Sequence, residues 1–564
     1  MTLVSVLPSL KKGKHTRGAA STNLSSVRGR YSYRMPRRVG IVIAFLLLLV
    51  PSAQFAWRNR DMPDFGRLHD DALMFVSAQG IAQGHGYRIG SLPENPYQTK
   101  YPPLFPAYLA LVWHLNPHFP ENLATATLFT WPWLAVCLAL ACWLYRQYGF
   151  SAERSLLLTA ALGLSPYMAL FGSMMLSEVF FTCFVLAALI LARRPGNGAI
   201  ALAGLAVACA YLARTAGIAL VISIPALLLL KHDGKRDWRR AALFLATSLP
   251  AVGAWTWWVR GHLSHSKDMT LLYYVDYMGF RTANFGLDNL TVILWKNIDQ
   301  ILYGMGSLVV PKIVDFLPLK ILTQVIAVAM LAGVVRLMRR GIAVDYAMFG
   351  LLSLGILVVW HYPPNERFVL PLFPLLLAGI VTEVEHLGSM LGKALHHKDA
   401  SQRVAAVLFA SGIAAVFLGA VALQAYMCFV TMPETADSQR VALADRREAY
   451  RWMSANLPSG SSVLSYDDPL LYLYSGHRGN YLPMLPRWWY AEDHAKIVNA
   501  YRDLGTYCKS RGLGYVYFTT EDMSRETGEE DRKAIEQEVR SNAALTPVYS
   551  AGIGTVYRVH STCK

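Results

Sequence analysis

The chain has 564 residues, of which 54% are hydrophobic and only 16% are charged. Soluble domains usually carry about 25% charged residues, whereas the apolar residues here gather in runs of about twenty, the length that crosses a bilayer. These totals exclude an ordinary soluble protein and predict a polytopic membrane protein.

The formal net charge of +16 would also suit a nucleic-acid-binding protein. The basic residues, however, concentrate in the N-terminal tail and in short loops between apolar runs. Cytoplasmic loops of membrane proteins carry such an excess of Lys and Arg, and they lie beside anionic lipids. We therefore expect membrane lipids, and no nucleic acid, among the partners.

Residues 1–37 are basic and rich in serine and glycine, which predicts a disordered cytoplasmic tail. We interpret the apolar segment at 38–57 as an uncleaved anchor, because many further spans follow it. Placing the basic loops inside predicts about eleven spans in a plasma (inner) membrane, with the N-terminus cytoplasmic and the C-terminus outside. The later spans are expected at residues 122–145, 153–171, 176–192, 197–213, 214–230, 241–258, 318–338, 342–360, 368–388 and 403–425.

Two large outer loops are predicted, at residues 58–121 and 259–317. The apolar piece at 103–116 is too short for a crossing, so we expect a helix that lies along the outer bilayer surface or re-enters it. The second loop is rich in aromatic residues, which suit a membrane interface. Its part around 296–310 is expected to dip back into the bilayer.

The composition changes near residue 430, where charge rises and the apolar runs shorten. A helix ending at Pro458 is followed by alternating strand-like and helix-like runs, which predicts a small α/β domain. The fold class expected is therefore mostly α, with a helix bundle over 38–425 and an extracytoplasmic α/β domain over 430–564. The strands are expected at residues 461–466, 515–520, 546–551 and 554–560, and the helices at 491–511 and 528–541.

The seven cysteines form no metal-binding pattern. Those at 137, 142, 183 and 209 lie in apolar runs and are expected to be small core residues. If the C-terminal part lies outside the cytoplasm, Cys508 and Cys563 are candidates for a disulfide.

Two adjacent acids, Asp70 and Asp71, begin a helix-like run in the first outer loop. A carboxylate near a membrane surface can act as a base on a hydroxyl or bind a divalent cation. The alternative is a solvated helix start, since acids are favoured in a first turn. The spacing of Asp71, Phe75 and Ala78 allows one acid to cap the helix while the other points into a cleft.

Glu178 and Arg367 each lie at the outer end of a predicted span. Glu178 could simply begin a helix capped by Ser177, but an acid in an apolar setting is costly and suggests function. Arg367 requires a partner, either Glu366 or Asp276, or a phosphate held by its guanidinium. The predicted topology places both residues on the same side as Asp70.

Further cations on the predicted outer side could join a phosphate site, namely Arg88, Lys100 and Arg214. The histidines that we considered as metal ligands lack the spacing of a metal site, so we expect them at the surface or at interfaces. They are His85, His361, His396 and His397.

In this order and at these span positions, the motifs resemble the GT-C superfamily of polytopic membrane glycosyltransferases. The narrower resemblance is to bacterial relatives of protein O-mannosyltransferases and lipid A aminoarabinose transferases, over about residues 38–390. The motifs that carry it are HDDALMFVSAQGIAQGHGY, KYPPLFPAYLALVW, GSMMLSEVFF, AYLARTAGIAL and NERFVLPLFP.

The resemblance implies a polyprenyl-phosphate-linked sugar donor, inverting transfer on the outer face, and a glycan, lipid or protein acceptor. Asp70 would be the base, Asp71 its companion acid, and Glu178 a second acid. Arg367 and Lys100 would bind the lipid phosphate. A divalent metal, Mg or Mn, is used by some relatives only, and Asp70 and Glu178 would be its ligands here.

Two other functions fit part of the pattern. A transporter or polyprenyl-lipid flippase could use Asp70 and Glu178 as coupling groups, but transporters usually have repeated halves and broken helices at mid-membrane, and neither is visible in the sequence. A catalytically silent lipid-binding relative would not need Asp70, which is present.

Overall fold

The computed structural model describes residues 37–230, 237–263, 268–396, 399–524 and 526–560. The predicted tail at 1–37 lies outside this part of the chain, apart from Arg37. The described residues fall into two units, one that ends at residue 47 and one that begins at residue 48. All helices and strands after α1 (Arg37–Arg58) belong to the second unit.

All eleven expected spans coincide with helical segments in the described residues. Six of these are long and apolar enough to cross a membrane, and the bent pair α5 and α6, which turns by 62°, makes up to seven. The other four are shorter; the 16 residues of α7 would extend about 24 Å, against about 30 Å of bilayer core. The chain is thus a polytopic helical membrane protein, as predicted.

The bounds of these segments follow the predicted ones closely. The long helices are α1, α4 (Asn122–Gln147), α10 (Trp238–His262), α14 (Leu317–Arg339), α17 (Phe373–Leu395) and α18 (Ala400–Tyr426). The bent pair is α5 (Ala152–Gly163) and α6 (Pro166–Ser173), and the shorter helices are α7 (Ser177–Ala192), α8 (Asn197–Ala213), α9 (Ile218–Leu229) and α15 (Val344–Val358).

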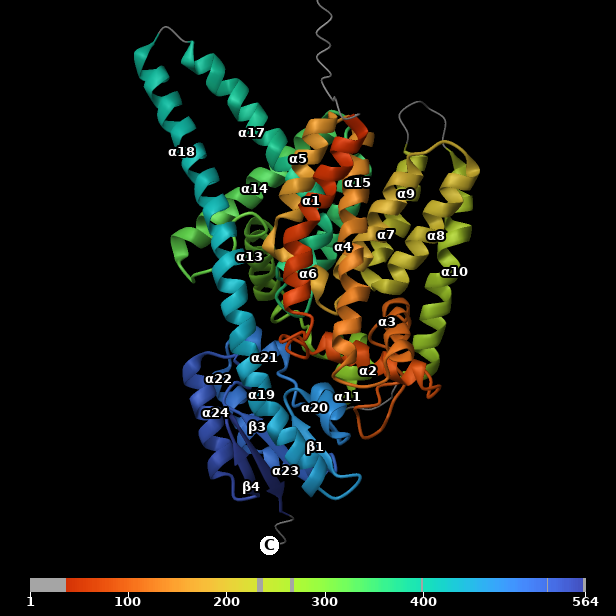
Figure 1. The fold of residues 1–564 in the computed structure, drawn as a ribbon, viewed down its shortest axis with the longest axis vertical. Coiled ribbons are helices and arrows are strands. Elements are labelled where there is room, and N and C mark those ends of the chain that lie inside the picture. The colour runs from red at the N-terminus through yellow and green to blue at the C-terminus, as the bar shows by residue number, and fades with distance from the viewer. Residues whose placement is uncertain (1–36, 231–236, 264–267, 397–398, 525, 561–564) are drawn as a thin grey trace, which may run out of the picture. The chain divides into compact units, whose positions relative to one another are not determined.

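The basic loops meet at one end of the bundle, the upper end in Figure 1. Arg193 lies 3.2 Å from Asp345, and Arg154 lies 2.9 Å from Glu385. Arg240 donates a hydrogen bond of 2.8 Å to the backbone carbonyl of Arg194. The loops that the sequence marks as basic therefore lie together at one end of the bundle, as the positive-inside rule predicts.

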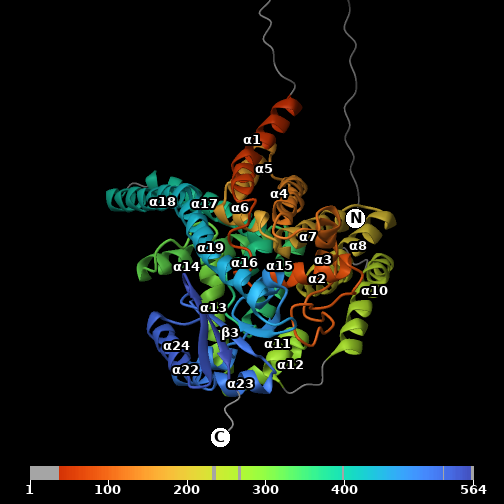
Figure 2. The ribbon, with the colours of Figure 1, turned by 60° about the horizontal axis from the view of Figure 1, so that its bottom comes forward.

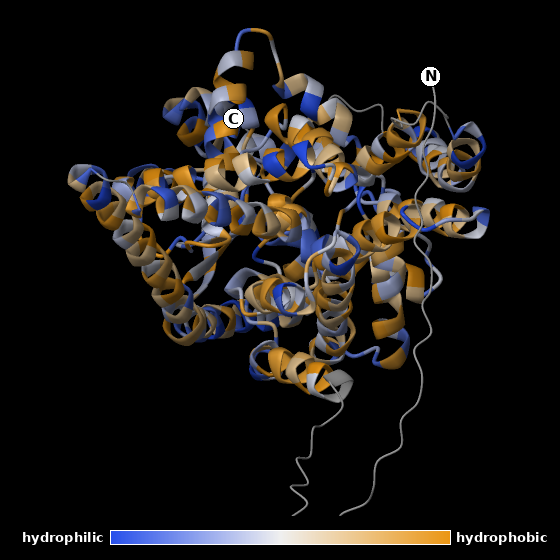
Figure 3. Ribbon diagram, turned by 90° about the horizontal axis from the view of Figure 1, so that it is seen from above, coloured by the Kyte–Doolittle hydropathy of each residue, from blue (hydrophilic) through white to orange (hydrophobic). Residues whose placement is uncertain are grey.

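The long helices present apolar side chains outward, as helices in contact with lipid do. Figure 3 shows apolar residues distributed along them. Exposed examples on α18 are Leu408, Phe417 and Leu418, each more than 60% exposed. Such a surface in water would be an aggregation hazard, which supports a bilayer around these helices.

Short helices lie at the other end of the bundle, beside the C-terminal part (Figure 1). The predicted helix at 103–116 is present as α3 (Leu104–Leu115), which packs against α2 through a hydrogen bond from Trp113 to the carbonyl of Phe75. The other elements here are α2 (Asp70–Ala82), α11 (Met269–Val275), α12 (Tyr277–Asn284) and α16 (Glu366–Val369), whereas the longer α13 (Leu290–Ser307) packs against α14 and α15 of the bundle.

The aromatic residues of 259–317 do not all face the bilayer interface. Trp295 is 73% exposed, as expected, but Tyr273, Tyr274 and Phe280 are buried in a cluster with Leu73 of α2. The interface interpretation was wrong for these three residues. Composition alone cannot distinguish an aromatic residue that anchors a helix from one that packs around a site.

The C-terminal part contains a five-stranded sheet with the order β2-β1-β3-β5-β4. The first three strands in that order are parallel, whereas β5 is antiparallel to both β3 and β4. The sheet confirms the predicted α/β class, and the four expected strands are all present. The strands are β1 (Ser462–Ser465), β2 (Arg478–Asn480), β3 (Tyr515–Thr519), β4 (Leu545–Ala551) and β5 (Gly554–Val559).

Helices cover both faces of this sheet (Figure 2). On one face Val516 and Phe518 of β3 pack in a core with Ile497 and Ile535 from two helices. On the other face Tyr517 contacts Tyr450 with ring centroids 5.6 Å apart. The helices are α19 (Met432–Asn456), α20 (Asp468–Ser475), α21 (Pro486–Ala491), α22 (His494–Arg502), α23 (Leu504–Ser510) and α24 (Glu529–Ser541).

A continuous helix of 57 residues, Ala400–Asn456, joins the bundle to the sheet. Its two parts, α18 and α19, meet in a π-helical turn at Met427–Thr431. The composition change near 430 therefore lies inside a helix rather than in a linker, and the predicted domain boundary stays a prediction.

Cysteines 137 and 183 are buried, in agreement with their expected place in the core, and those at 142 and 209 are half-buried. Cys508 is also buried, in the core of the C-terminal part. Cys563 lies outside the described residues, so the Cys508–Cys563 disulfide stays a prediction.

Candidate active site

Four helix ends bring charged residues together at the end of the bundle nearest the sheet. Asp70 begins α2, Glu178 is in the first turn of α7, and Arg367 is in the first turn of α16. Arg214 occupies the break between α8 and the short 3₁₀ helix that precedes α9. The first turn of a helix favours acids, so both carboxylates are in electrostatically suitable places.

Arg367 bridges the two acids. Its Nη2 lies 2.7 Å from Asp70 Oδ2, and its Nε donates to Glu178 Oε1. The Arg367 side chain is only 9% exposed and that of Glu178 only 1%. Three charged groups predicted from separate motifs therefore form one buried network.

The local partners expected for Arg367 were wrong. Glu366 instead pairs with Lys312 at 2.6 Å, and Asp276 accepts a hydrogen bond from the backbone of Gly279. Successive residues of a helix point about 100° apart, so Glu366 faces away from its neighbour's guanidinium.

A second guanidinium also holds Glu178. Arg214 Nη1 lies 2.6 Å from Glu178 Oε1 and 3.2 Å from Ser177 Oγ. Ser177 thus contacts this arginine, and it does not cap α7. A carboxylate out of water costs several kcal/mol unless it is paired, and here two arginines provide the compensation.

Asp70 is held in its ionised form. Burial would raise the pKa of its carboxyl, but the charges of Arg367 and Lys100 and a hydrogen bond from the Tyr101 hydroxyl outweigh burial and hold the pKa well below its usual range. The preceding residue, His69, has a positive φ of 61°, which turns the chain sharply into α2. Asp70 is therefore an unprotonated carboxylate at neutral pH.

Asp71 has the opposite character. Its side chain is buried, Oδ2 accepts a hydrogen bond of 3.0 Å from the backbone of Gly66, and Oδ1 has no hydrogen-bond partner among the described residues. Burial raises the pKa of Asp71 to about 6. Neighbouring acids whose pKa values are pushed apart commonly divide catalytic roles.

Lys100 lies among aromatic rings close to Asp70. Its Nζ is 3.7 Å from the ring centroid of Tyr273, 5.0 Å from that of Tyr277 and 5.3 Å from that of Tyr101. Ring faces attract an ammonium group. Burial lowers the pKa of Lys100 to about 8, although the Asp70 carboxylate opposes this shift.

Arg88 does not join this network. Its guanidinium lies 3.7 Å from the ring centroid of Tyr97, and its Nη1 donates to the carbonyl of Asn95. Within the described residues it makes no hydrogen bond or ion pair with Asp70 or Glu178. The structure thus brings five of the seven predicted site residues together. Asp71 faces the backbone of Gly66 instead, and Arg88 makes its contacts within its own loop.

No protein-family model and no curated protein matches this chain. Solved structures that share its architecture include the following two. ArnT from Cupriavidus metallidurans, bound to undecaprenyl phosphate, is 14% identical with a TM-score of 0.53, over 93% of this chain and 99% of that one. The archaeal oligosaccharyltransferase AglB from Archaeoglobus fulgidus, in complex with an inhibitory peptide and a dolichol-phosphate, is 12% identical with a TM-score of 0.52, over 93% and 75%.

The chain has the GT-C fold. The resemblance inferred from the motifs is confirmed at the level of the fold, which is what identities this low establish. In this GT-C fold the charged network lies where the helix ends of the bundle meet the loop at 58–121 and the C-terminal part.

The acids of this GT-C chain do not fit a divalent metal site. The Arg367 guanidinium lies between Asp70 and Glu178, and both oxygens of Asp70 are engaged, by Arg367 and by Tyr101. Among the described residues no cluster of three or more acidic, His or Cys side chains could hold a metal ion.

One histidine differs from expectation. His361 is 1% exposed and packs among aromatic rings, with Tyr277 4.7 Å away, so the surface interpretation was wrong for it. His85 and His396 are exposed as expected, and His397 lies outside the described residues.

No sequence motif predicted a link between the site and the C-terminal part. The buried Asp468 of α20 lies 2.9 Å from His69 Nε2 and accepts a hydrogen bond of 2.6 Å from the Tyr274 hydroxyl. Because His69 directly precedes Asp70, this link fixes the start of α2. Tyr101, which follows Lys100 and donates a hydrogen bond to Asp70, is part of the KYPP motif, but the sequence alone predicted no role for it.

Proposed function

We propose that this protein is an integral membrane glycosyltransferase. It moves a sugar from a polyprenyl-phosphate donor to a hydroxyl of a glycan, lipid or protein on the outer face of the membrane. The observation that carries the proposal is the buried Asp70–Arg367–Glu178 network at the ends of membrane helices. The polyprenyl phosphates bound in the ArnT and AglB structures support the donor class.

The cations of the site suit a phosphate. Arg367, Arg214 and Lys100 face the two carboxylates Asp70 and Glu178, which leaves one positive charge in excess (three minus two). Guanidinium groups bind phosphate through paired, charge-assisted hydrogen bonds. Bound phosphate would compete with Asp70 for Arg367 and so release the carboxylate for catalysis.

Asp70 acts as the base. As the acceptor oxygen bonds to the sugar C1, the bond from C1 to the phosphate oxygen breaks, the lipid phosphate leaves, and the acceptor proton passes to Asp70. A carboxylate of low pKa is a weak base, but it suffices when the proton moves late, after the acceptor oxygen has become acidic. The departing phosphate needs no acid catalyst, and the cations stabilise its charge.

The stereochemistry proposed is inversion. A retaining reaction through a covalent intermediate would need a second carboxylate that is free to attack the sugar. Glu178 is the other buried acid in the network, and Arg214 and Arg367 hold it in two ion pairs. A single displacement assisted by Asp70 follows.

Transfer assays on the purified protein in lipid nanodiscs test this proposal. With labelled polyprenyl-phosphate sugars, Asp70→Asn should reduce sugar release and transfer about 10²–10⁴-fold, the usual contribution of a general base. Asp71→Asn is the matched control; because Asp71 bonds only to backbone, it should reduce the rate less.

Unchanged turnover in Asp70→Asn would refute the assignment of the base. Movement of intact lipid-linked sugar across the bilayer without transfer would instead establish the transporter. A panel of hexose and pentose donors run in the same assay identifies the sugar.

A further inference from the structure

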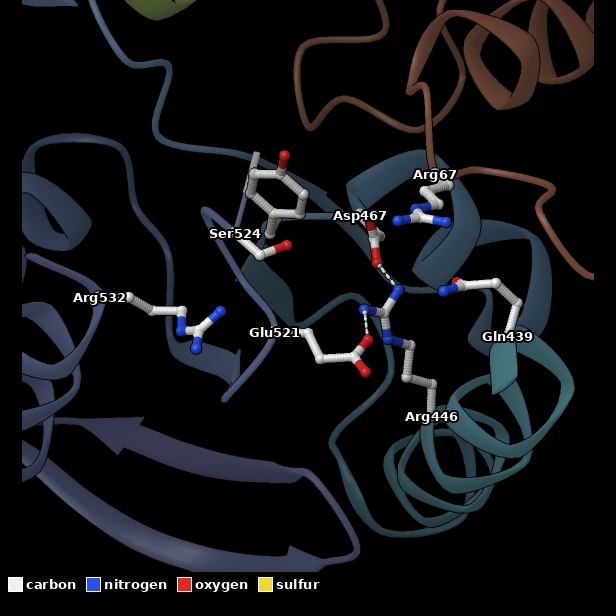
Figure 4. Close-up of a pocket in the computed structure, with 8 residues that line it drawn as sticks. Arg67, Gln439, Arg446, Asp467, Glu521, Ser524 and Arg532 are labelled. Carbon is white, nitrogen blue, oxygen red and sulfur yellow. Dashed lines mark hydrogen bonds and ion pairs between the residues drawn. The ribbon is translucent and has the colours of Figure 1, made fainter. Parts of the chain in front are cut away.

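A second charged cavity lies in the C-terminal part, away from the Asp70 network. It has a volume of about 210 Å³, and Figure 4 shows side chains from several elements pointing toward it. Three arginines from three different segments line it: Arg67 from the outer loop, Arg446 from α19 and Arg532 from α24.

The sheet topology independently marks this place as a binding crevice. In an open sheet with parallel strands, ligands bind beyond the carboxyl ends of the strands, where the strand order reverses. The chain passes from β1 to β2 on one side and then to β3 on the other, so the reversal lies between β1 and β3. The lining residues Asp467 and Glu521 follow the carboxyl ends of β1 and β3.

The lining has unused capacity for an anion. Arg446 pairs with Asp467 and with Glu521, but its Nε is buried and has no hydrogen-bond partner among the described residues. The Arg532 side chain makes no hydrogen bond or ion pair within that part of the chain, and it points toward the cavity in Figure 4. The Arg67 Nη1 also lies 3.4 Å from Asp64, so the capacity for an anion rests on the Arg446 Nε and on Arg532.

The size of the cavity favours more than an inorganic ion. Its volume is about seven times the 30 Å³ or so that a water molecule occupies in the liquid. The ring of Tyr466 also lines it and offers an apolar surface beside the charges. This combination suits a sugar that carries an anionic group.

Two connections tie the cavity to Asp70. Arg67 precedes Asp70 by three residues in the same loop. Asp467 is followed by Asp468, whose carboxylate lies 2.9 Å from His69, the residue before Asp70. A ligand in the cavity therefore lies on the same side of the molecule as the proposed base, beside the loop that positions it.

We propose that this cavity binds a phosphate or carboxylate group carried by a sugar of the acceptor. The assignment of the ligand to the acceptor rests on the proposed glycosyltransferase function. Guanidinium groups from Arg67, Arg446 and Arg532 hold the anionic group, and the rest of the acceptor extends toward Asp70.

Calorimetric titration of the full-length protein in nanodiscs tests this proposal. Glucose 6-phosphate should bind, and both glucose and inorganic phosphate should bind at least tenfold more weakly, because each lacks one half of the recognised group. Loss of one charge-assisted contact should weaken glucose 6-phosphate binding about tenfold in Arg532→Gln, and similarly in Arg67→Gln. The matched control, Arg558→Gln on the exposed surface of β5, should leave binding unchanged.

Binding of glucose 6-phosphate that is equal in Arg532→Gln, Arg67→Gln and Arg558→Gln would overturn the proposal. Equal affinity for inorganic phosphate would assign the site to the free ion and overturn the sugar assignment. Asp70→Asn separates the two proposals: it should abolish transfer and leave glucose 6-phosphate binding unchanged. Intact transfer without this binding refutes the cavity alone, whereas binding without transfer by the wild type refutes the assignment to an acceptor.

Discussion

Adjacent residues of this protein differ sharply in their electrostatic surroundings. Asp70 faces the cations of Arg367 and Lys100, which lower the pKa of its carboxyl below the usual range. Asp71 points to the other side of the helix start, toward the backbone of Gly66, where burial raises its pKa to about 6. The side that each carboxylate faces, rather than its type, decides the direction in which its pKa is shifted.

The buried Asp71 should make stability depend on pH. Its folded-state pKa of about 6 exceeds the usual 3.8 of an aspartate in water, so the folded state binds the proton more tightly than the unfolded state does. The stability that this provides is complete below about pH 4 and is lost as pH rises through about 6. The loss approaches about 3 kcal/mol, from roughly two pKa units. Thermal unfolding from pH 4 to 8 should show it.

Asp71→Asn should flatten this pH dependence and unfold at a higher temperature than the wild type at pH 7.5. Asp61, whose pKa is lowered beside Arg440, provides a control of opposite sign. Relative to the wild type, Asp61→Asn should be destabilised more at pH 7.5 than at pH 4. An effect of Asp71→Asn that is the same at every pH would contradict the assignment.

Individual residues of the candidate site could be predicted where they belong to a sequence motif. Asp70, Glu178 and Arg367 were placed on one side because the basic loops fixed the direction of every span. Their direct pairing was not predictable, since the three residues are far apart in sequence and only the helix packing brings them together. The contact of Asp468 with the site was unpredictable for the same reason, because Asp468 lies 398 positions after Asp70 (468 minus 70) and reaches His69 through a tertiary contact.

At the scale of elements, close helix packing depends on two glycines. A Cβ at Gly333 of α14 would overlap the carbonyl oxygen of Gly379 of α17, and a Cβ at Gly379 would overlap the carbonyl oxygen of Met330. Small residues allow membrane helices to approach this closely. The α14–α17 contact thus requires glycine on both helices.

Gly333→Val should separate α14 from α17 and destabilise the protein by about 1–3 kcal/mol, the usual cost of overpacking. Gly355→Val on α15 is the matched control, because a Cβ there meets no atom within 4 Å. Thermal unfolding in the same detergent compares them. Equal midpoints for the two variants would show that the helices tolerate the added side chain.

Elements with strong periodic patterns were predictable, and short ones were not. The runs of β-branched and aromatic residues in β3 and β5 and the helical pattern of α24 appear in the sequence. Strand β2 has only three residues, RGN, with no apolar alternation. Helix α20, DPLLYLYS, is too short to show a helical period. Both depend on neighbouring strands and helices for their conformation.

At the scale of the whole molecule, the basic loops define the two ends. The loops that contain Arg193 and Arg154 lie at one end, and the charged network lies at the other. We propose that the first end is cytoplasmic, which places the C-terminal sheet outside. This orientation stays a prediction from the sequence, because it depends on loop charge alone.

Labelling of single added cysteines with a membrane-impermeant maleimide tests the orientation in intact cells. Ser541→Cys, exposed at the end of α24, should react at once, whereas Ser401→Cys, exposed at the start of α18, should react only after permeabilisation. The wild type, with its native cysteines, sets the background. Immediate reaction of Ser401→Cys would show that the orientation is opposite to the one proposed.

The uninterrupted helix Ala400–Asn456 imposes an angular constraint on the molecule. Each residue of an α-helix rotates the chain by about 100° and advances it by 1.5 Å. Insertion of one residue within α19, between Met432 and Arg446, would therefore turn Arg446 and the sheet beyond it by about a quarter of a revolution relative to the bundle. The wide π turn at Met427–Thr431 holds one residue more than an α turn, so it is the place where a change in chain length is absorbed without this rotation.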